Sequence, residues 1–377
     1  MFDAIQVIEQ AIEGTYKKLK SYYYYDKTLL HIKNKIVDFE TGNSFTDRMK
    51  KLCKNLYEEN QEYFEELIND IDMVIMPKSL KNVDAETKVI KGNIENNKKI
   101  SKLNFSIDAP VELFIIDMLW MLIVKKLYLQ KYGEFEYSYA GKLKKGIMKK
   151  DTDIINGIDF VSNRCFEPYF QCYTKWRNKA LDVAKEYCKS ENILMISLDL
   201  KSFYYSVNFD FNSLDVIFNQ DERYNNISFL TNIIRLVYKK YTILISKYKC
   251  GIKKSDGNNI LPIGLISPLL IRDIYLAPID HDIIDKISPR YYGRYVDDML
   301  IVVKAGDSEN LSVEEYINQF LVKNEIIKAK NKAGEYEFLN DPSIRLQGEK
   351  VNCFFFEKGK DNILIDVYYK NIKRNSS

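Results

Sequence analysis

The chain has 377 residues, of which 46% are hydrophobic and 29% are charged, as in a soluble globular protein with one large or two smaller domains. The net charge of +3 is nearly neutral, so total charge does not identify a nucleic-acid-binding protein, and local clusters of charge matter more. Two histidines and the lack of a CxxC pair argue against a zinc site.

Residues 1–135 are predicted to form a mostly helical N-terminal region. Apolar residues recur at helical spacing over residues 2–19 and 45–68. Residues 83–102 are polar and rich in Lys and Asn, which predicts a loop. Residues 110–132 are predicted to form one strong helix.

The most apolar run of the chain, "LFIIDMLWMLIV", lies inside that last helix. It is too short to span a bilayer and it contains Asp117, so we expect a core helix and no membrane partner. The N-terminus lacks the basic region and cleavage site of a secretion signal. With scattered cysteines that we take to be reduced thiols, this favours a cytoplasmic protein.

From residue 193 onward, the pattern changes to a mixture of strands and helices. We predict strands at residues 193–200, on both sides of residues 297–298, and at 353–358 and 362–369; helices are predicted at residues 166–188, 228–241, 266–287 and 313–329. This order predicts an α+β fold with an antiparallel sheet packed on helices.

Two adjacent aspartates, Asp297 and Asp298, link "RYYGRYV" to "MLIVVK", two segments with strand composition. A two-residue link predicts a tight hairpin, and a polar turn is the simplest interpretation of the pair. However, the link lacks the glycine that such turns usually contain, and the flanking strands are too apolar for a solvent-exposed edge of a sheet. Both observations argue against a simple polar turn. A third carboxylate, Asp199, ends the buried segment "ILMISLDL".

If the strand of Asp199 neighbours this hairpin, three carboxylates converge. Two carboxylates about 4 Å apart repel by roughly 4 kcal/mol at an effective dielectric constant near 20, so they need cations or shifted pKa values. Magnesium prefers oxygen ligands and substrate phosphates. Two Mg²⁺ ions that clamp a phosphoryl transfer would explain the cluster, and this is the chemistry of nucleotide polymerases.

Three motifs in one order resemble the palm of reverse transcriptases. "DLKSFYYSV" is similar to motif A, "PIGLISPLLIRDIYL" to motif B, and "YVDD" to the YxDD box of motif C. The resemblance covers residues 193–369 well and residues 137–188 loosely. It implies a right-hand polymerase that consumes dNTPs with two Mg²⁺ ions: a helical N-terminal region (1–135), a fingers segment (136–192) and a palm (193–377).

The resemblance also implies roles for individual residues. Asp199, Asp297 and Asp298 would be catalytic and metal-binding, with the Leu200 carbonyl as a further ligand. Tyr204 would lie under the incoming sugar and exclude a 2′-hydroxyl, which favours DNA synthesis. An RNA polymerase on a related palm usually carries Asp at this point and GDD in motif C.

Motif B departs from the family pattern in two ways. A glutamine usually precedes its glycine, but here Ile263 precedes Gly264, and only two residues separate Gly264 from Ser267. The resemblance therefore does not imply ordinary template-dependent handling of the base pair. Gly264 is still predicted to contact the nucleotide, because a backbone that approaches a ligand closely cannot carry a Cβ atom; a plain turn before a helix is the alternative.

Two further segments resemble the abortive-infection, defence-associated group of bacterial reverse transcriptases. These are "YTKWRNKAL", and Gln347 and Lys350 followed by a phenylalanine run. The resemblance implies antiphage defence, a reduced or absent thumb, and either untemplated, protein-primed synthesis or copying of a non-coding RNA. A protein partner or a homo-oligomer is also compatible with it.

Basic residues form clusters on both sides of motif A. Lysines can neutralise phosphates and aromatic rings can stack on bases, although a solvated surface explains most single lysines. We predict Arg177 as a nucleotide contact, and Lys144, Lys145, Gln347 and Lys350 as nucleic-acid contacts. The alternative function is a non-catalytic nucleic-acid-binding or assembly protein on a polymerase palm.

Overall fold

The computed structural model describes residues 5–26, 29–41, 44–82, 98–150, 153–248, 257–306, 311–330 and 334–360. The chain divides into two compact units that are each assembled from separate segments. The first comprises Met1–Leu127, Lys149–Asn163 and Asp210–Pro268, and the second comprises Tyr128–Met148, Arg164–Phe209 and Leu269–Ser377.

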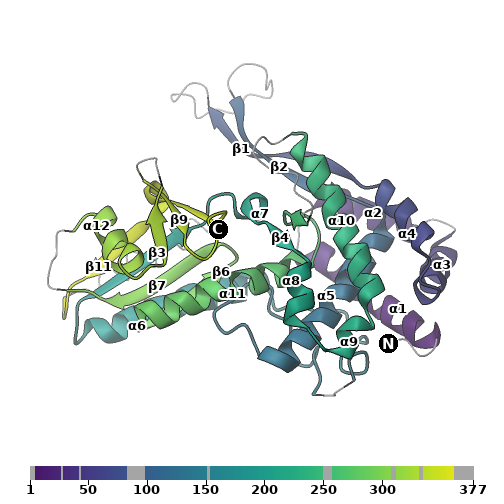
Figure 1. Ribbon diagram of the computed structural model, residues 1–377, viewed down its shortest axis with the longest axis horizontal. Helices are drawn as coiled ribbons and strands as arrows, with labels where there is room; N and C mark the ends of the chain where they lie inside the picture. The colour runs from purple at the N-terminus through teal and green to yellow at the C-terminus, as the bar shows by residue number, and fades with distance from the viewer. Residues whose placement is uncertain are drawn as a thin grey trace. The chain divides into compact units, whose positions relative to one another are not determined.

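The first unit is built around one buried helix, α5 (Val111–Tyr132), whose side chains are buried from Val111 to Leu127. A helix that is apolar on all sides belongs in a core, as predicted. Trp120 of α5 donates a hydrogen bond to Thr231 Oγ1 at 3.0 Å. The surrounding helices are α1 (Ile5–Ser21), α2 (Leu30–Thr41), α3 (Phe45–Tyr57), α4 (Gln61–Asn69), α8 (Asn212–Ile217), α9 (Glu222–Asn225) and α10 (Ser228–Ser246), shown in Figure 1.

The first unit also contains a β-hairpin that the sequence analysis did not predict. Strands β1 (Asp72–Asn82) and β2 (Lys98–Asp108) pair antiparallel, and β2 includes residues 98–102, which were expected to be loop. The pairing register shifts between Pro77 and Ser79, because proline cannot donate to a strand ladder. The remaining residues of the expected loop lie outside the described residues.

The predicted helix over residues 45–68 is in fact two helices. The chain breaks at Glu59, which has φ +50, and Asn60 then caps α4 by accepting a hydrogen bond from the Tyr63 backbone N–H at 3.3 Å. An asparagine at this position satisfies one of the free donors at the start of a helix. Local capping chemistry therefore overrides the continuous apolar pattern.

The second unit carries a four-stranded antiparallel sheet with the order β11-β3-β7-β6. Its strands are β3 (Ile193–Asp199), β6 (Tyr291–Tyr295), β7 (Asp298–Lys304) and β11 (Asn352–Phe356). The central strands β3 and β7 are almost entirely buried, which explains their continuous apolar runs. This mixed fold with antiparallel strands agrees with the predicted α+β class.

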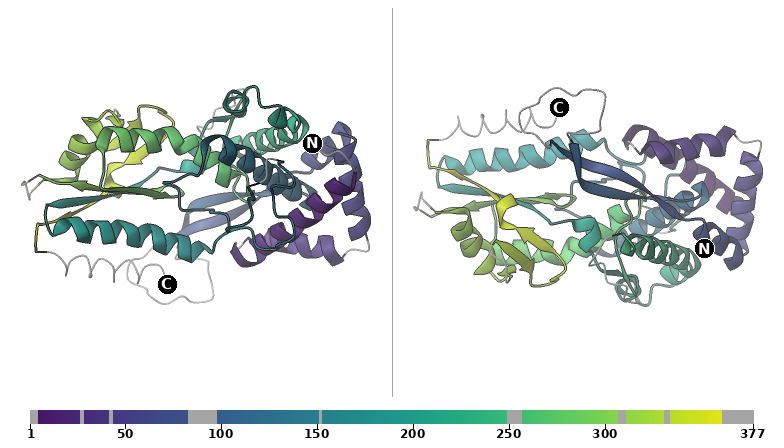
Figure 2. Two further views of the ribbon diagram at one scale, coloured as in Figure 1. Left: turned by 90° about the horizontal axis from the view of Figure 1, so that it is seen from below. Right: turned by 90° about the horizontal axis from the view of Figure 1, so that it is seen from above.

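Helices cover both faces of this sheet, as Figure 2 shows. Helix α6 (Tyr169–Cys188) lies on one face, where Trp176, Ala180 and Ala184 recur every fourth residue and pack into the core. Helices α11 (Pro268–Ile287) and α12 (Val313–Ile317) lie on the other face. The sheet is therefore held rigidly from both sides.

The end of the second unit differs from the prediction in one helix. The helix predicted over residues 313–329 begins at a capping box formed by Ser312 and Glu315, but ends in a π-helical turn, Asn318–Val322. Ile327–Ala329 is instead strand β8, which pairs with β9 (Glu335–Phe338), and β10 (Arg345–Gln347) completes this small sheet. The predicted strand at residues 362–369 lies outside the described residues.

The remaining short elements are α7 (Phe203–Ser206), β4 (Phe209–Asp210), β5 (Asn258–Asn259) and a 3₁₀ turn, Gly348–Lys350. Among the described residues, no helix is long and apolar enough to cross a membrane.

Candidate active site

The two aspartates of the YVDD segment sit at the turn between β6 and β7. The prediction that both of them form the two-residue link is wrong by one position. Val296 and Asp297 form the turn, and Asp298 is the first residue of β7. Val296 has φ +60, an unusual conformation for a β-branched side chain that costs roughly 1–3 kcal/mol. Such strain persists only where the surrounding structure enforces it, here at the tip that carries the carboxylates.

The sheet register brings the first of the predicted carboxylates beside this turn. Asp199 pairs directly with Asp298 across β3 and β7. Directly opposite residues of an antiparallel pair point to the same face, with Cβ atoms about 4.5–5.5 Å apart. The Leu200 backbone N–H also donates to the Asp297 carbonyl at 3.3 Å. The prediction that the strand of Asp199 neighbours the hairpin is therefore confirmed.

Burial and neighbouring negative charges both act on the Asp298 carboxyl. Burial, together with the negative charges of Asp297 and Asp199, raises the pKa of Asp298 to about 7. The Lys350 ammonium opposes this shift. Lys350 lies at the end of the 3₁₀ turn before β11, and its Nζ donates to Asp199 Oδ1 at 2.8 Å.

Among the described residues, no three His, Cys, Asp or Glu side chains form a group that could hold a metal ion as they stand. The expected set of three carboxylates at metal-binding distance is thus not present among these residues. The Lys350 ammonium instead forms a hydrogen bond with Asp199 Oδ1. The donor chemistry still fits Mg²⁺, which prefers carboxylate and carbonyl oxygens. Burial and the negative charges of Asp297 and Asp199 raise the pKa of Asp298, and a divalent cation would favour its ionised form.

Tyr204 lies five residues after Asp199, in α7. Burial raises the pKa of its hydroxyl, the negative charge of Asp297 adds to this, and the charge of Arg272 lowers it. The phenol is therefore neutral at physiological pH and lies within electrostatic range of the hairpin tip. Its ring contacts the Phe203 ring with centroids 5.9 Å apart.

A buried network of charges fixes the hairpin to α11. Arg294, which precedes the YVDD segment by one residue on β6, is fully buried and donates to both Asp280 carboxylate oxygens at 2.9 Å and to Asp273 Oδ1 at 3.0 Å. Arg272 donates to the same Asp273 oxygen, and the Tyr292 hydroxyl donates to Asp280 at 2.6 Å. The two arginines balance the two carboxylates, so the network holds β6 without a net buried charge.

Gly264 of the motif B segment belongs to the first unit. It has φ +114, and a Cβ atom there would lie 2.8 Å from Ser106 Oγ and 3.0 Å from Ile107 Cγ2. The Tyr23 hydroxyl donates to its carbonyl. The close approach of β2 therefore requires glycine here, and this requirement is independent of any nucleotide contact.

Asp117 anchors the residues that follow Gly264. Its Oδ2 accepts the backbone N–H groups of Ile266 at 2.7 Å and Ser267 at 3.0 Å. Burial raises the pKa of this carboxyl to about 6, against the opposing effect of these hydrogen bonds. This role was not predicted, although a carboxylate inside the most apolar run of the sequence indicates that it must have buried partners.

The other predicted contacts lie in the second unit. Arg177 is buried in α6, with its guanidinium carbon 6.0 Å from the centroid of the Tyr173 ring. Lys144 is half-buried and Lys145 is exposed in the irregular segment before α6, and Gln347 ends β10. Of this group, Lys350 donates a hydrogen bond to one of the aspartates, Asp199.

The sequence matches the reverse transcriptase (RNA-dependent DNA polymerase) family over residues 154–342, half of the chain. The chain belongs to this family. It is therefore a nucleotidyltransferase, and a reverse transcriptase acts on nucleotides and nucleic acid. The match includes all three aspartates, Tyr204 and Gly264, and ends before Gln347 and Lys350. No curated protein matches the chain.

Proposed function

We propose that this reverse transcriptase synthesises DNA at the site formed by Asp199, Asp297 and Asp298. The observation that carries the proposal is the direct pairing of Asp199 with Asp298 across β3 and β7, next to the strained turn that presents Asp297. Carboxylates held at directly opposite positions repel each other, and a protein that only bound nucleic acid would have no use for this cluster. This favours catalysis over the alternative of a binding or assembly subunit.

Asp199 and Asp297 would hold two Mg²⁺ ions, the Leu200 carbonyl would add a ligand, and Asp298 would support the site. When bound, magnesium supplies positive charge for the attacking and leaving oxygens of a phosphoryl transfer. In the reaction, a hydroxyl oxygen forms a bond to the α-phosphorus of a dNTP. The bond from this phosphorus to the β-phosphate bridging oxygen breaks, pyrophosphate leaves, and the hydroxyl proton passes to solvent.

Tyr204 would select deoxynucleotides by excluding a 2′-hydroxyl from the space next to its ring. Its neutral phenol, close enough to sense the charge of Asp297, supports a place beside the incoming sugar. Gly264 and Arg177 would contact the nucleotide, and Lys144, Lys145, Gln347 and Lys350 the nucleic acid. In this assignment, residues 1–135 are an N-terminal helical region, residues 136–192 the fingers segment and residues 193–377 the palm, with a reduced or absent thumb.

The biological role we propose is antiphage defence. It rests on two segments, residues 173–181 and the stretch from Gln347 to β11, which resemble the abortive-infection, defence-associated group of reverse transcriptases. In that group, synthesis either is primed by a protein hydroxyl without a template or copies a non-coding RNA. The tyrosine run near the N-terminus bears on the first route. Tyr22 and Tyr23 are buried, whereas Tyr24 is 38% and Tyr25 is 73% exposed, so only the last two present a ring to solvent.

One incorporation experiment tests these proposals together. Purified protein is incubated with Mg²⁺ and each labelled dNTP singly, with and without RNase treatment, and the product is tested for protease sensitivity. Loss of incorporation after RNase identifies a templating or structural RNA. Label that resists RNase and stays on the denatured protein identifies protein-primed synthesis. Failure to incorporate any dNTP, with retained binding of nucleic acid, would favour the non-catalytic alternative.

A further inference from the structure

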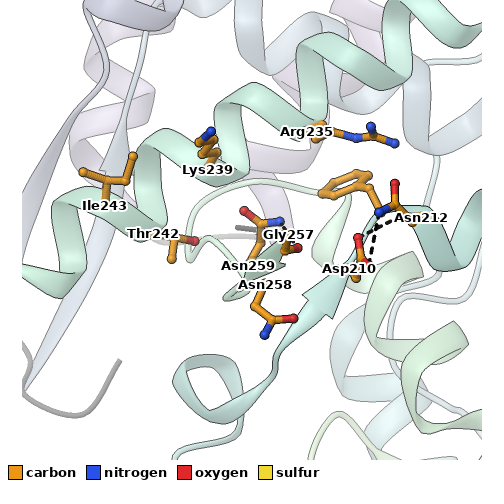
Figure 3. A pocket seen from close by; sticks show the side chains of 10 residues that line it. Asp210, Asn212, Arg235, Lys239, Thr242, Ile243, Gly257, Asn258 and Asn259 are labelled. Atoms are coloured by element: carbon orange, nitrogen blue, oxygen red, sulfur yellow. Dashed lines mark hydrogen bonds between the residues drawn. The ribbon is translucent and has the colours of Figure 1, made fainter. Parts of the chain in front are cut away.

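A cavity of about 650 Å³ opens in the first unit between α10, the start of α8 and strand β5. Figure 3 shows its lining side chains. Its volume is within the roughly 300–1,000 Å³ of small-molecule sites. All of the lining residues belong to the first unit, and none is a residue to which we assign a role in catalysis or nucleotide binding.

One wall of the cavity is cationic. Arg235 and Lys239 are four residues apart on α10, so they lie on the same face of the helix. Arg235 Nη2 lies 3.3 Å from Asp215 Oδ2, an ion pair in which both side chains are more than one-third exposed and which contributes at most about 1 kcal/mol. Within the described part of the chain, the buried Arg235 Nε has no hydrogen-bond partner. The N–H donors of the Arg235 guanidinium are thus only weakly bonded within the protein. The planar arrangement of these donors matches the geometry of a phosphate group.

The opposite wall is built from amides and one carboxylate, and Figure 3 shows these side chains gathered across from α10. Asn258 is exposed on β5, and the buried Asn259 is held by its Nδ2, which donates to the Gly257 carbonyl at 2.9 Å. Asp210 accepts the Asn212 backbone N–H at 2.9 Å. Amide and carboxylate groups can pair with the donors and acceptors on the edge of an unpaired base.

The two walls together narrow the class of ligand. A compact polyanion would be attracted by Arg235 and Lys239 but repelled by Asp210, whereas a nucleotide carries its phosphate and its base at opposite ends. Ile243, which is 38% exposed at the edge of the cavity, offers apolar surface for a sugar or a base ring. The separation of cationic, apolar and amide groups therefore matches one nucleotide unit.

We propose that this cavity binds a nucleotide, with its phosphate at Arg235 and Lys239 and its base at Asn258 and Asp210. The nucleotide is either free or one unit of a single-stranded nucleic acid, and both sources present the same chemistry. The proposal does not depend on the aspartates of the second unit.

The test measures binding of a fluorescent single-stranded oligonucleotide and of radiolabelled AMP to the full-length protein. EDTA is present, so that no polymerisation takes place. The double variant Arg235→Gln/Lys239→Gln is compared with Lys50→Gln/Lys54→Gln. The control removes two exposed lysines at the same helical spacing from α3, away from the cavity. Circular dichroism and thermal melting confirm that both variants fold.

We expect the Arg235/Lys239 variant to bind the oligonucleotide at least about tenfold more weakly at moderate salt. The slope of log K against log salt should become shallower by about 0.7, which corresponds to one single-strand phosphate contact. Asn258→Ala should weaken binding with an unchanged salt slope, as expected for a base contact.

The two ligands distinguish the source of the nucleotide. A loss of AMP binding in the Arg235/Lys239 variant assigns the cavity to a free nucleotide, and a loss for the oligonucleotide alone assigns it to a strand. Equal binding of both ligands by this variant and by the α3 control would overturn the proposal. Because no turnover is measured, a chain that binds through the cavity but incorporates no nucleotide would contradict only the proposed function.

Discussion

Lys350 Nζ donates a hydrogen bond to Asp199 Oδ1 at 2.8 Å, although 151 positions separate the two residues along the chain. The turn before β11 delivers the lysine to this oxygen, because β11 pairs with the strand that ends in Asp199. A cation supplied by the protein thus occupies an oxygen that we assign to magnesium.

We therefore expect Lys350→Met to strengthen Mg²⁺ binding, because it removes a competitor for Asp199 Oδ1. Both side chains are more than one-third exposed, so the pair contributes about 0.4–1 kcal/mol and the dissociation constant should fall about two- to fivefold. Calorimetric titration of Mg²⁺ without nucleotide measures this. Lys360→Met, which removes an exposed lysine paired with Glu357, is the control. A dissociation constant that is unchanged or higher in Lys350→Met would contradict the competition.

Asp298→Asn should stabilise the fold in EDTA at pH 8. The pKa of Asp298 rises from 3.8 to about 7 on folding, so the folded state favours the protonated form and loses stability as pH increases through about 7. After allowance for partial exposure to solvent, we expect a gain of about 2 kcal/mol at pH 8 and a smaller gain at pH 5. Urea unfolding at both pH values measures this, and the exposed Asp182→Asn serves as the control. A gain that is absent or independent of pH would contradict the raised pKa of Asp298.

Arg294→Met should destabilise the second unit by about 3–5 kcal/mol, because it leaves Asp280 and Asp273 buried with too little positive charge. The control, Arg290→Met, removes an arginine that lies just before β6 and forms an ion pair with Glu191. Because that arginine is exposed, its loss should change stability by less than about 1 kcal/mol. Denaturant midpoints compare the two variants. Similar losses of stability in the two variants would mean that the buried Arg294 network stabilises the fold no more than an exposed ion pair does.

Tyr204→Val should relax the preference for deoxynucleotides if the ring excludes a 2′-hydroxyl. We expect the ratio of dATP to ATP in kcat/KM to fall by at least about tenfold, since rejection by a steric wall is lost when the wall is removed. Tyr204→Phe keeps the ring and should keep the ratio. A ratio that stays constant in Tyr204→Val would assign the tyrosine to packing alone.

The sequence predicts the central elements of both units well, because their apolar runs are long. The helix within residues 110–132 and the strands β3, β6 and β7 all have a single interpretation by length and composition. The β1–β2 hairpin was missed because its burial does not follow a clear alternation, since the consecutive residues Phe105, Ser106 and Ile107 of β2 are all buried. Ile75 and Leu103 are 44% and 42% exposed, so no clear apolar alternation marks the strands.

The candidate site was predictable only in part for a related reason. Asp199 and Asp297 stand in recognisable local patterns, but the contacts of Lys350, Asp117 and Arg294 join residues that are distant along the chain. A lysine before a strand, or a carboxylate within a helix, does not identify its partner without the register of the sheet. The local shift that places Val296 in the turn likewise depends on the pairing of Tyr295 with Asp298.

The most direct test of the account is Mg²⁺-dependent incorporation of labelled dNTPs by the wild-type protein and by Asp297→Asn. The substitution preserves the size of a half-buried side chain at the turn, so the fold should survive, as checked by circular dichroism and by binding to a single-stranded oligonucleotide in EDTA. The account predicts that wild-type incorporation stops in EDTA and that Asp297→Asn retains less than about one thousandth of it, as for loss of a group essential to transition-state stabilisation. Incorporation by Asp297→Asn at the wild-type rate would contradict the assignment of this hairpin as the catalytic site.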